Sequence, residues 1–338
     1  MKPMSITASA TGATIATNPA PGRSCPLHYR YGAAAICGAP LRTAHTLYVI
    51  GGLYGNLVAL DTVEALALVE SGQTGHTPTL CFNGDFNWFN TADSHFAQIN
   101  QRVLQHHAIL GNVEAELYSP QDDAGCGCAY PGSVDATVVQ WSNLIHAQLK
   151  TTAQRHPALL ARLAQLPMFA RYQVAGCRVG VVHGDADALA GWGFDVQALD
   201  NPHAQPWLHT VFAAADVDVF ASSHTCLPAL RQLALTNHRS GIVANNGAAG
   251  MPNFAGDLAG LFTRIGSTPS PHPVLQELRV GTAYVALLPL RFDVAHWQAD
   301  FLAQWPVGSA AWASYFERIT RGPDYTTAQA LAGRRTTG

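Results

Sequence analysis

The chain has 338 residues, and its composition is 48% hydrophobic and only 12% charged. The charged share is about half of the usual value, so we expect the chain to bury a large core. The net charge is −3 with no basic block, which argues against nucleic acid as a partner, and no apolar run approaches the roughly 18 residues that a membrane helix needs.

The N-terminal segment and the cysteines bear on location. Residues 1–23 are rich in Ala, Thr, Ser and Pro and lack the apolar core of a secretory signal, so we interpret them as a flexible lead-in. The seven cysteines are odd in number and scattered along the chain. This pattern does not indicate a disulfide framework, and it favours a reducing, cytoplasmic location.

The first half of the chain alternates between short apolar runs and segments with helical spacing. Apolar runs at 47–50, 79–82 and 107–110 each end near a glycine and predict buried strands. Segments 56–71 and 92–106 place their apolar residues at helical intervals. This order of strand, helix and strand predicts a layered α/β domain.

The second half is predicted to be richer in strands. A loop at 118–133, which contains Cys126 and Cys128, leads into two predicted helices at 134–150 and 158–166. Further helices are predicted at 207–215, 295–304 and 310–319. Strands are predicted at 169–174, 178–182, 217–220, 229–235, 241–244 and 283–291, the first two as an antiparallel pair.

Four polar side chains follow four of the predicted strands. They are Asp85, Asn112, His183 and His224, hereafter the donor set. Strands that end in glycine turns bring such side chains to the carboxyl edge of a sheet, where open α/β sheets bind ligands. One carboxylate, one amide and two imidazoles suit Mn, Fe or Zn rather than Ca or Mg. A metal ion held there can lower the pKa of a bound water and polarise a phosphoryl oxygen.

The segments around the donor set, in this order, resemble the motifs of the calcineurin-like metallophosphoesterase family. The family order is Asp-x-His, Gly-Asp, Gly-Asn-His-Glu/Asp, a lone His and Gly-His-x-His, over roughly residues 45 to 295 here. A later Asn-Pro-Gly-Ser segment is also found in many bacterial members. The matching segments are 49–56, 84–85, 111–114, His183, 223–226 and 245–248.

The resemblance implies a fold and an activity. The fold is a four-layer α/β/β/α sandwich of mixed sheets flanked by helices. It implies a metallophosphoesterase-like domain at 41–295, a flexible or extended lead-in at 1–40 and a C-terminal helical extension at 296–338. The implied activity is hydrolysis of phosphomonoesters or phosphodiesters, and the implied partner is a small-molecule phosphoester or a phosphoprotein substrate.

Members of the family hold two metal ions, and only one of the two sites is intact here. The resemblance assigns one ion to the donor set, with Asp85, Asn112 and His183 as catalytic residues. The other ion would share Asp85 and use three further ligands. Those three are replaced by Gly52, Tyr54 and Cys226, hereafter the replaced positions. The resemblance therefore implies one divalent ion and puts the second site in doubt.

Val113 stands where the family has a histidine that is thought to protonate the leaving group or steady the transition state. A valine can do neither, so a two-metal clamp on the attacking and leaving oxygens is not expected in its usual form. One alternative is a catalytically weak or inactive protein that keeps the fold for binding. Another is a rebuilt metal centre with thiolate ligands from Cys226, Cys126 and Cys128, of which the last two could instead act as a redox pair.

Several neighbouring residues allow more than one interpretation. Cys226 is either an additional ligand or a small buried hydrophobe, and Tyr54 either contacts a ligand or packs into the space beside the replaced positions. The tryptophans and phenylalanines that follow two of the donors either line an apolar substrate pocket or belong to the core. They are Trp88, Phe89, Trp192 and Phe194. Asp185 and Asp187 either orient the two histidines or lie in a solvated loop.

Overall fold

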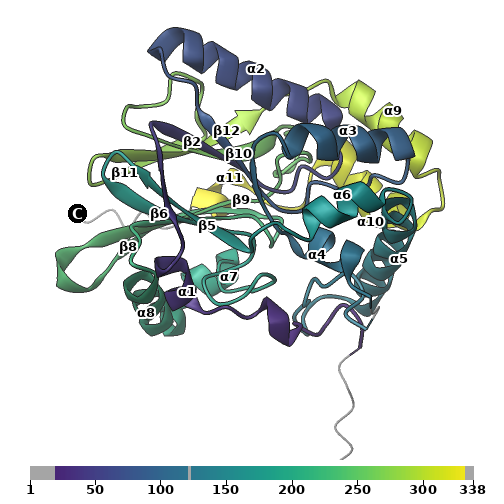
Figure 1. Ribbon diagram of the computed structural model, residues 1–338, viewed down its shortest axis with the longest axis horizontal. Helices are drawn as coiled ribbons and strands as arrows, with labels where there is room; N and C mark the ends of the chain where they lie inside the picture. Colours follow the sequence, from purple (N-terminus) through teal and green to yellow (C-terminus); the bar gives the residue numbers. More distant parts are fainter. Residues whose placement is uncertain (1–19, 121–122, 332–338) are drawn as a thin grey trace, which may run out of the picture.

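Two mixed sheets form the centre of the molecule. The computed structural model describes residues 20–120 and 123–331 (Figure 1). The first sheet has the order β11-β12-β10-β2-β3-β4, in which β2, β3 and β4 are parallel and the other pairs are antiparallel. Its strands are β2 (Thr46–Ile50), β3 (Thr79–Asn83), β4 (His107–Ile109), β10 (Gly260–Gly266), β11 (Gln276–Val280) and β12 (Ala283–Leu290).

The second sheet has the order β1-β5-β6-β7-β9-β8. The pairs β1–β5, β6–β7 and β7–β9 are parallel, whereas β5–β6 and β8–β9 are antiparallel. The predicted antiparallel pairing of the two strands on either side of residues 175 and 176 is therefore confirmed. The strands are β1 (Leu41–Ala44), β5 (Phe169–Val174), β6 (Cys177–Val182), β7 (Val219–Ser222), β8 (Pro228–Ala234) and β9 (Ser240–Asn246).

Helices cover the outer face of each sheet, which confirms the predicted four-layer α/β/β/α sandwich (Figure 1). α2 (Leu57–Thr74), α3 (Asp93–Val103) and α9 (Val294–Gln304) lie over the first sheet, and α1 (Ala33–Cys37) and α8 (Gln205–Ala215) lie over the second. The remaining helices are α4 (Asn112–Tyr118), α5 (Ala136–Ala153), α6 (Pro157–Leu163), α7 (Val196–Asp200), α10 (Ala310–Arg321) and α11 (Thr327–Leu331), with short 3-10 turns at Leu27–Tyr29, Pro202–Ala204 and Thr236–His238.

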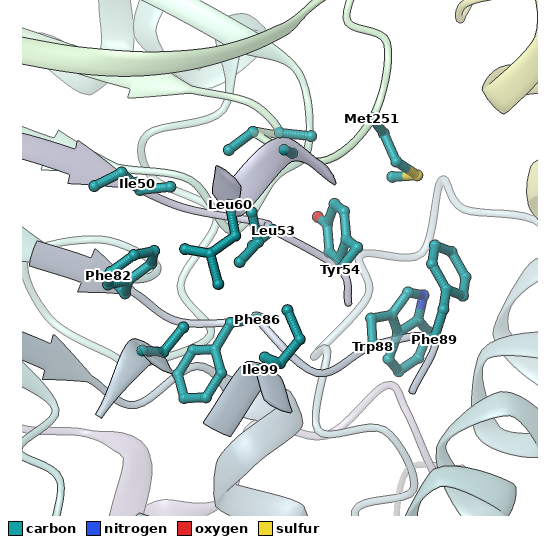
Figure 2. Close-up of a cluster of buried hydrophobic side chains, with 14 of the residues drawn as sticks. Ile50, Leu53, Tyr54, Leu60, Phe82, Phe86, Trp88, Phe89, Ile99 and Met251 are labelled. Atoms are coloured by element: carbon teal, nitrogen blue, oxygen red, sulfur yellow. The ribbon is translucent and has the colours of Figure 1, made fainter. Parts of the chain in front are cut away.

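Three clusters of buried side chains hold these layers together. The cluster between the sheets includes Val49 and Val181, one from each sheet. The cluster under α2 and α3 combines Ile50 and Phe82 of the first sheet with Leu60 of α2 (Figure 2). A third cluster joins the outer face of the second sheet to α8. Because the inner and outer faces are both apolar, the central strands are continuous apolar runs, and this is why they were predictable.

The predicted elements agree with the structure to within a few residues, and several further elements were not predicted. β1 is an edge strand with mostly exposed side chains, so it has no apolar run. β10 carries Thr263 and Arg264 near its centre, and these polar residues interrupt the apolar pattern. Arg264 is fully buried because its guanidinium Nη2 lies 2.7 Å from Oε1 of Glu70 on α2, a partner that the local sequence does not reveal.

The structure differs from the predicted lead-in over the residues that it describes. Leu27–Tyr29 and Ala33–Cys37 are helical, and Tyr29 is fully buried. The phenol of Tyr29 donates a hydrogen bond to buried Glu116, which fixes this segment against α4. Residues 1–19 lie outside the described residues, and the predicted division of the chain into three parts stays a prediction.

No helix within residues 20–120 and 123–331 combines the length and the apolar character needed to cross a membrane.

Candidate metal centre

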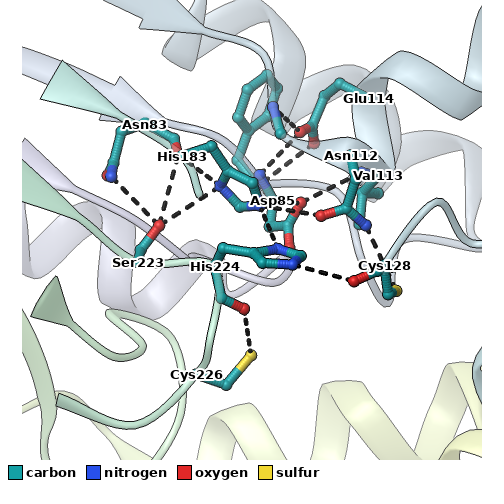
Figure 3. Close-up of polar contacts among 12 residues, drawn as sticks. Asn83, Asp85, Asn112, Val113, Glu114, Cys128, His183, Ser223, His224 and Cys226 are labelled. Carbon is teal, nitrogen blue, oxygen red and sulfur yellow. Dashed lines mark hydrogen bonds and ion pairs between the residues drawn. The ribbon is translucent and has the colours of Figure 1, made fainter. Parts of the chain in front are cut away.

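The donor set lies where the carboxyl ends of four strands meet between the two sheets (Figure 3). Asp85 follows β3 and Asn112 is the first residue of α4 after β4, so both come from the first sheet. His183 directly follows β6 and His224 follows β7, so both come from the second sheet. β3 and β4 are parallel to each other, as are β6 and β7, which brings all four side chains to one edge.

The four donor atoms converge on one point. Nε2 of His183 lies 3.0 Å from Oδ1 of Asn112, 3.1 Å from Nδ1 of His224 and 3.4 Å from Oδ1 of Asp85. The ligand atoms of the carboxylate and the two imidazoles all lie within 4.8 Å of one another. All four side chains are buried. A cluster of this size and composition is suited to one transition-metal ion.

Main-chain carbonyl groups fix the orientation of the three nitrogen-bearing donors. Nδ1 of His183 donates to the Asn83 carbonyl at 2.8 Å, which leaves Nε2 to face the centre. Nε2 of His224 donates to the Cys128 carbonyl at 3.1 Å, and Nδ2 of Asn112 donates to the Cys126 carbonyl at 2.8 Å. Each contact therefore directs a ligating atom inward, as is usual around protein metal sites.

Two glycines allow the loops after β3 and β4 to approach each other closely. A Cβ atom at Gly111 would lie 2.3 Å from Oδ1 of Asp85, and one at Gly84 would lie 2.5 Å from the Cα of Gly111. Asp85 itself has a φ of 53°, in the left-handed region that non-glycine residues rarely adopt. Such backbone strain is typical of functional sites, where the surrounding contacts hold it in place.

Glu114 supplies those surrounding contacts. Its carboxylate accepts hydrogen bonds from the backbone N–H groups of Asp85, Phe86, Asn87 and Gly111 and from the side chain of Asn87. Burial and the nearby Asp85 carboxylate raise the pKa of Glu114 to about 7, although the hydrogen bonds from the backbone N–H groups lower it. Glu114 thus positions the Asp85 loop from behind and does not itself face the donor atoms.

Replacing Glu114 with Gln is expected to destabilise the metal-free protein by about 2–4 kcal/mol, because an amide NH2 would face backbone N–H groups and leave them unpaired. Urea unfolding at pH 8, where the wild-type carboxyl is ionised, measures this change. Glu317→Gln is the matched control, since Glu317 is 85% exposed and makes only a long surface contact with Arg321. Equal unfolding midpoints for the two variants would contradict the role given to Glu114.

The protonation states of the two histidines differ. Burial and the neighbouring His183 lower the pKa of His224 to about 3, so this imidazole is neutral. Burial also opposes a charge on His183, but the Asp85 carboxylate outweighs it and raises the pKa of His183 above its usual value. Burial opposes the charge on Asp85 as well, and the adjacent His183 nevertheless lowers the pKa of this carboxyl group. Both shifts favour a protonated His183 beside an ionised Asp85 in the metal-free cluster.

The replaced positions are filled by packed side chains. Tyr54 is buried, and its hydroxyl lies 2.8 Å from Sγ of Cys226. A Cβ atom at Gly52, whose φ is 64°, would lie 3.0 Å from the Tyr54 ring. The ring thus occupies the space into which a side chain at Gly52 would project. Burial, Cys226 and Asp85 raise the pKa of Tyr54 well above its usual value, so the phenol is neutral.

Cys226 is directed away from the donor set. Besides Tyr54, its thiol contacts the carbonyl oxygen of His224 at 3.3 Å (Figure 3). The additional-ligand role predicted for Cys226 stays a prediction, and the structure gives the thiol these other partners.

Cys126 and Cys128 are joined by a disulfide bond. This finding contradicts the hypothesis of a rebuilt centre that uses both residues as thiolate ligands, because neither sulfur is a thiolate. The bridge is local, and Cys25, Cys37, Cys81, Cys177 and Cys226 are free. The contribution of the bridged loop is its carbonyl groups, which orient Asn112 and His224.

Asp185 and Asp187 do not orient the histidines in the structure. Asp185 accepts hydrogen bonds from the backbone N–H groups of Asp187, Ala188 and Gly193 and so closes its own loop. Asp187 accepts from the indole of Trp207. The predicted role in orientation is therefore wrong, since backbone carbonyl groups perform it.

The aromatic residues near the donor set belong to a pocket or to the core, and Trp88 belongs to both. Trp88 and Trp192 line a cavity of about 240 Å³ next to Asp85, Asn112 and His224. Phe89 and Phe194 are fully buried in the hydrophobic clusters.

Sequence reasoning did not identify Glu114 as the residue that positions Asp85, or Arg318 as part of the cavity wall. The third motif contains Glu114, which is a signal that could have pointed to it. Arg318 lies far from the donor set in the sequence, and no motif points to it.

No family model matches the chain, and no curated protein sequence matches it. Among the solved structures that match, two illustrate the shared fold. A metallophosphoesterase from Sphaerobacter thermophilus is 17% identical with a TM-score of 0.51, and the match covers 83% of this chain and 100% of that one. A hypothetical protein from Pyrococcus horikoshii is 13% identical with a TM-score of 0.55, and the match covers 84% of this chain and 100% of that one. The fold implied by the sequence resemblance, that of the calcineurin-like metallophosphoesterases, is thereby confirmed.

Proposed function

We propose that the chain is a metal-dependent hydrolase of phosphoric esters that works with one divalent ion, Mn, Fe or Zn, at the donor set. The observation that carries this proposal is the orientation of the donors. Both histidines and Asn112 have their outer atoms engaged by carbonyl groups, so that their ligating atoms face one buried point together with Asp85. Structural histidines have no need of such convergence.

The residues of the site have distinct roles in this proposal. A bound divalent ion would lower the pKa of a water molecule toward neutrality and polarise a phosphoryl oxygen. Asp85 supplies the single carboxylate that offsets the charge of the ion, and His183 and His224 act as neutral nitrogen ligands. Val113 has no proton to donate to a leaving group. Esters of acidic alcohols, whose anions leave without protonation, are therefore the expected substrates.

The cavity favours a small-molecule substrate over a phosphoprotein. Its volume of about 240 Å³ lies below the roughly 300–1,000 Å³ of typical ligand pockets. We also propose a cytoplasmic location, which the five free thiols support and the Cys126–Cys128 bridge, a feature rare in reducing compartments, opposes.

Elemental analysis combined with an activity assay tests the proposal. The purified protein is expected to contain about one Mn, Fe or Zn ion per chain, and to hydrolyse bis-p-nitrophenyl phosphate or p-nitrophenyl phosphate until a chelator removes the ion. Restoration of activity by the same metal completes the test. Metal-loaded protein without turnover of either ester would overturn the catalytic part of the proposal.

A binding protein that keeps the fold is the second candidate, and the packing of Tyr54 favours it. Tyr54 and Cys226 contact each other where the family resemblance implies ligands for a second ion. A protein with this function would bind phosphate esters without hydrolysing them. Robust turnover that follows the metal content of highly purified protein would exclude it.

Metal binding is expected to release about one proton per ion at pH 6, because His183 carries a proton in the metal-free cluster whereas His224 does not. Since the pKa of His183 is raised above its usual value of about 6.5, metal affinity should increase with pH up to that raised pKa and then level off. Calorimetric titration in two buffers with different ionisation enthalpies counts the protons. His296→Gln, at an exposed position, should leave the count unchanged. Release of no proton would contradict these assignments.

A further inference from the structure

The cavity beside the donor set has five aromatic residues in its walls and, among the described residues that line it, one cationic side chain. Its aromatic residues are Tyr54, Trp88, Tyr130, Trp192 and Tyr315. Among the described residues that line it, Arg318 is the only arginine or lysine. The walls come from the loops after β2, β3, β6 and β7, from α4, from α5 with the loop before it, and from α10, so α10 completes a pocket built by the two sheets.

Arg318 is held in place by carbonyl groups rather than by a carboxylate. Its Nη2 donates to the Cys226 carbonyl at 2.7 Å, and its Nε donates to the Pro252 carbonyl at 3.2 Å. Over residues 20–120 and 123–331 it takes part in no ion pair, whereas Arg321, one turn further along α10, faces Glu317. Arg318 is half-buried, so its charge is neither fully hydrated nor neutralised by the protein.

The charge of Arg318 lies on the side of the replaced positions. Its Nη2 contacts the carbonyl group of Cys226, and Arg318, Cys226 and Tyr54 line the same cavity. Because only two of its N–H groups contact carbonyl oxygens, the other N–H groups of the guanidinium can donate hydrogen bonds to an anion. A fixed guanidinium matches the oxygens of a phosphoryl group and binds them through paired, charge-assisted hydrogen bonds.

The aromatic walls indicate what else the ligand contains. The ring centroids of Tyr130 and Trp192 lie 6.0 Å apart, and those of Trp88 and Tyr315 lie 6.3 Å apart. Faces and edges of such rings favour an aromatic group, which they contact by offset stacking or edge-to-face packing. The lack of a proton donor at Val113 points in the same direction, because phenols leave as anions more readily than alkyl alcohols.

We propose that Arg318 binds the phosphoryl group of the substrate from the side of Tyr54 and Cys226, and that Trp88 and Trp192 bind an aromatic leaving group, so that the substrates are aryl phosphoesters. This proposal rests on the proposed function of the donor set for its catalytic meaning. The binding that it describes is measurable without catalysis. Arg318 supplies positive charge on the side where the family resemblance implies a second metal ion.

Calorimetric binding of phenylphosphonate, a stable analogue of an aryl phosphate, tests the proposal on metal-loaded protein. Arg318→Gln is expected to weaken this binding by about 10- to 100-fold while the metal content stays unchanged. Arg318→Lys, which keeps the positive charge, should weaken the binding by a smaller factor. Arg321→Gln on the same helix is the matched control and should bind as the wild type does. Trp192→Leu is expected to reduce the preference for phenylphosphonate over methylphosphonate by about tenfold.

Thermal melts of each variant separate binding from folding. If Arg318→Gln is less stable than the wild type, Arg318→Lys and Trp192→Leu still provide the binding comparison. Unchanged phenylphosphonate affinity in folded Arg318→Gln would overturn the role of Arg318, and so would absence of binding to the wild type. Equal affinity of the wild type for phenylphosphonate and methylphosphonate would overturn the proposal that Trp88 and Trp192 bind an aromatic group.

The same measurements separate this proposal from the proposed function. Binding that depends on Arg318, without turnover of any aryl ester, would support the binding site and overturn the hydrolase. Turnover of aryl esters at wild-type kcat and KM by Arg318→Gln would leave the hydrolase in place and overturn the role of Arg318.

Discussion

Asp85→Asn is expected to remove both the metal ion and the turnover. Asp85 is the only carboxylate of the donor set, and two buried imidazoles and an amide cannot offset the charge of a divalent ion. Loss of a group that merely orients a ligand costs about 10- to 100-fold in metal affinity, so loss of the charged ligand should cost more. Elemental analysis after dialysis and steady-state hydrolysis of p-nitrophenyl esters measure the two effects.

The matched control for this variant is Asp61→Asn. Asp61 of α2 is 65% exposed and forms a surface ion pair with Arg102 of α3, so its substitution should change neither metal content nor activity. Full activity in Asp85→Asn would show that the donor set is not the catalytic centre. Retained metal with lost activity would instead show that other atoms hold the ion.

The triple variant Gly52→Asp, Tyr54→His and Cys226→His is expected to raise the metal content from about one to about two ions per chain, because it restores the three family ligands beside Asp85. Tyr54→His is essential to this result. The Tyr54 ring lies where a side chain at position 52 would project, so the two substitutions must be made together.

Gly52→Asp alone is the informative control for the triple variant. The φ of 64° and the contact with the Tyr54 ring should make it less stable by roughly 1–3 kcal/mol, without uptake of a second ion. Denaturant unfolding and elemental analysis of both variants give the comparison. A stable single variant would show that Tyr54 does not occupy the space beside Gly52. A triple variant that still holds one ion would show that the three replaced positions do not complete a second metal site.

The sequence predicted the parts of the site that depend on local pattern. The donors of the first sheet follow apolar runs and stand next to glycines, and both features are legible without tertiary structure. The contacts that make the site work are long-range. Asn83 and His183 are 100 residues apart, and Cys128 and His224 are 96 residues apart. Such pairs form only when the two sheets pack together.

The features that could not be predicted also depend on long-range or tertiary contacts. Arg264 was not recognised as a strand residue because its partner Glu70 lies 194 positions away. Arg318 reaches the cavity because α10 packs against α5, a contact without a sequence motif. The disulfide between Cys126 and Cys128 follows from the turn of one loop, and the Cys-x-Cys spacing alone does not indicate it.

The donor set draws two residues from each sheet, so a bound ion would cross-link the two halves of the sandwich. A ligand that binds the folded state and not the unfolded state adds about 2.7 kcal/mol to the free energy of unfolding when its free concentration is 100 times its dissociation constant. Resistance to unfolding, and hence to proteases that cleave unfolded chains, would then vary with the concentration of free metal. The lifetime of this protein would follow the metal supply of its surroundings even where no substrate is present.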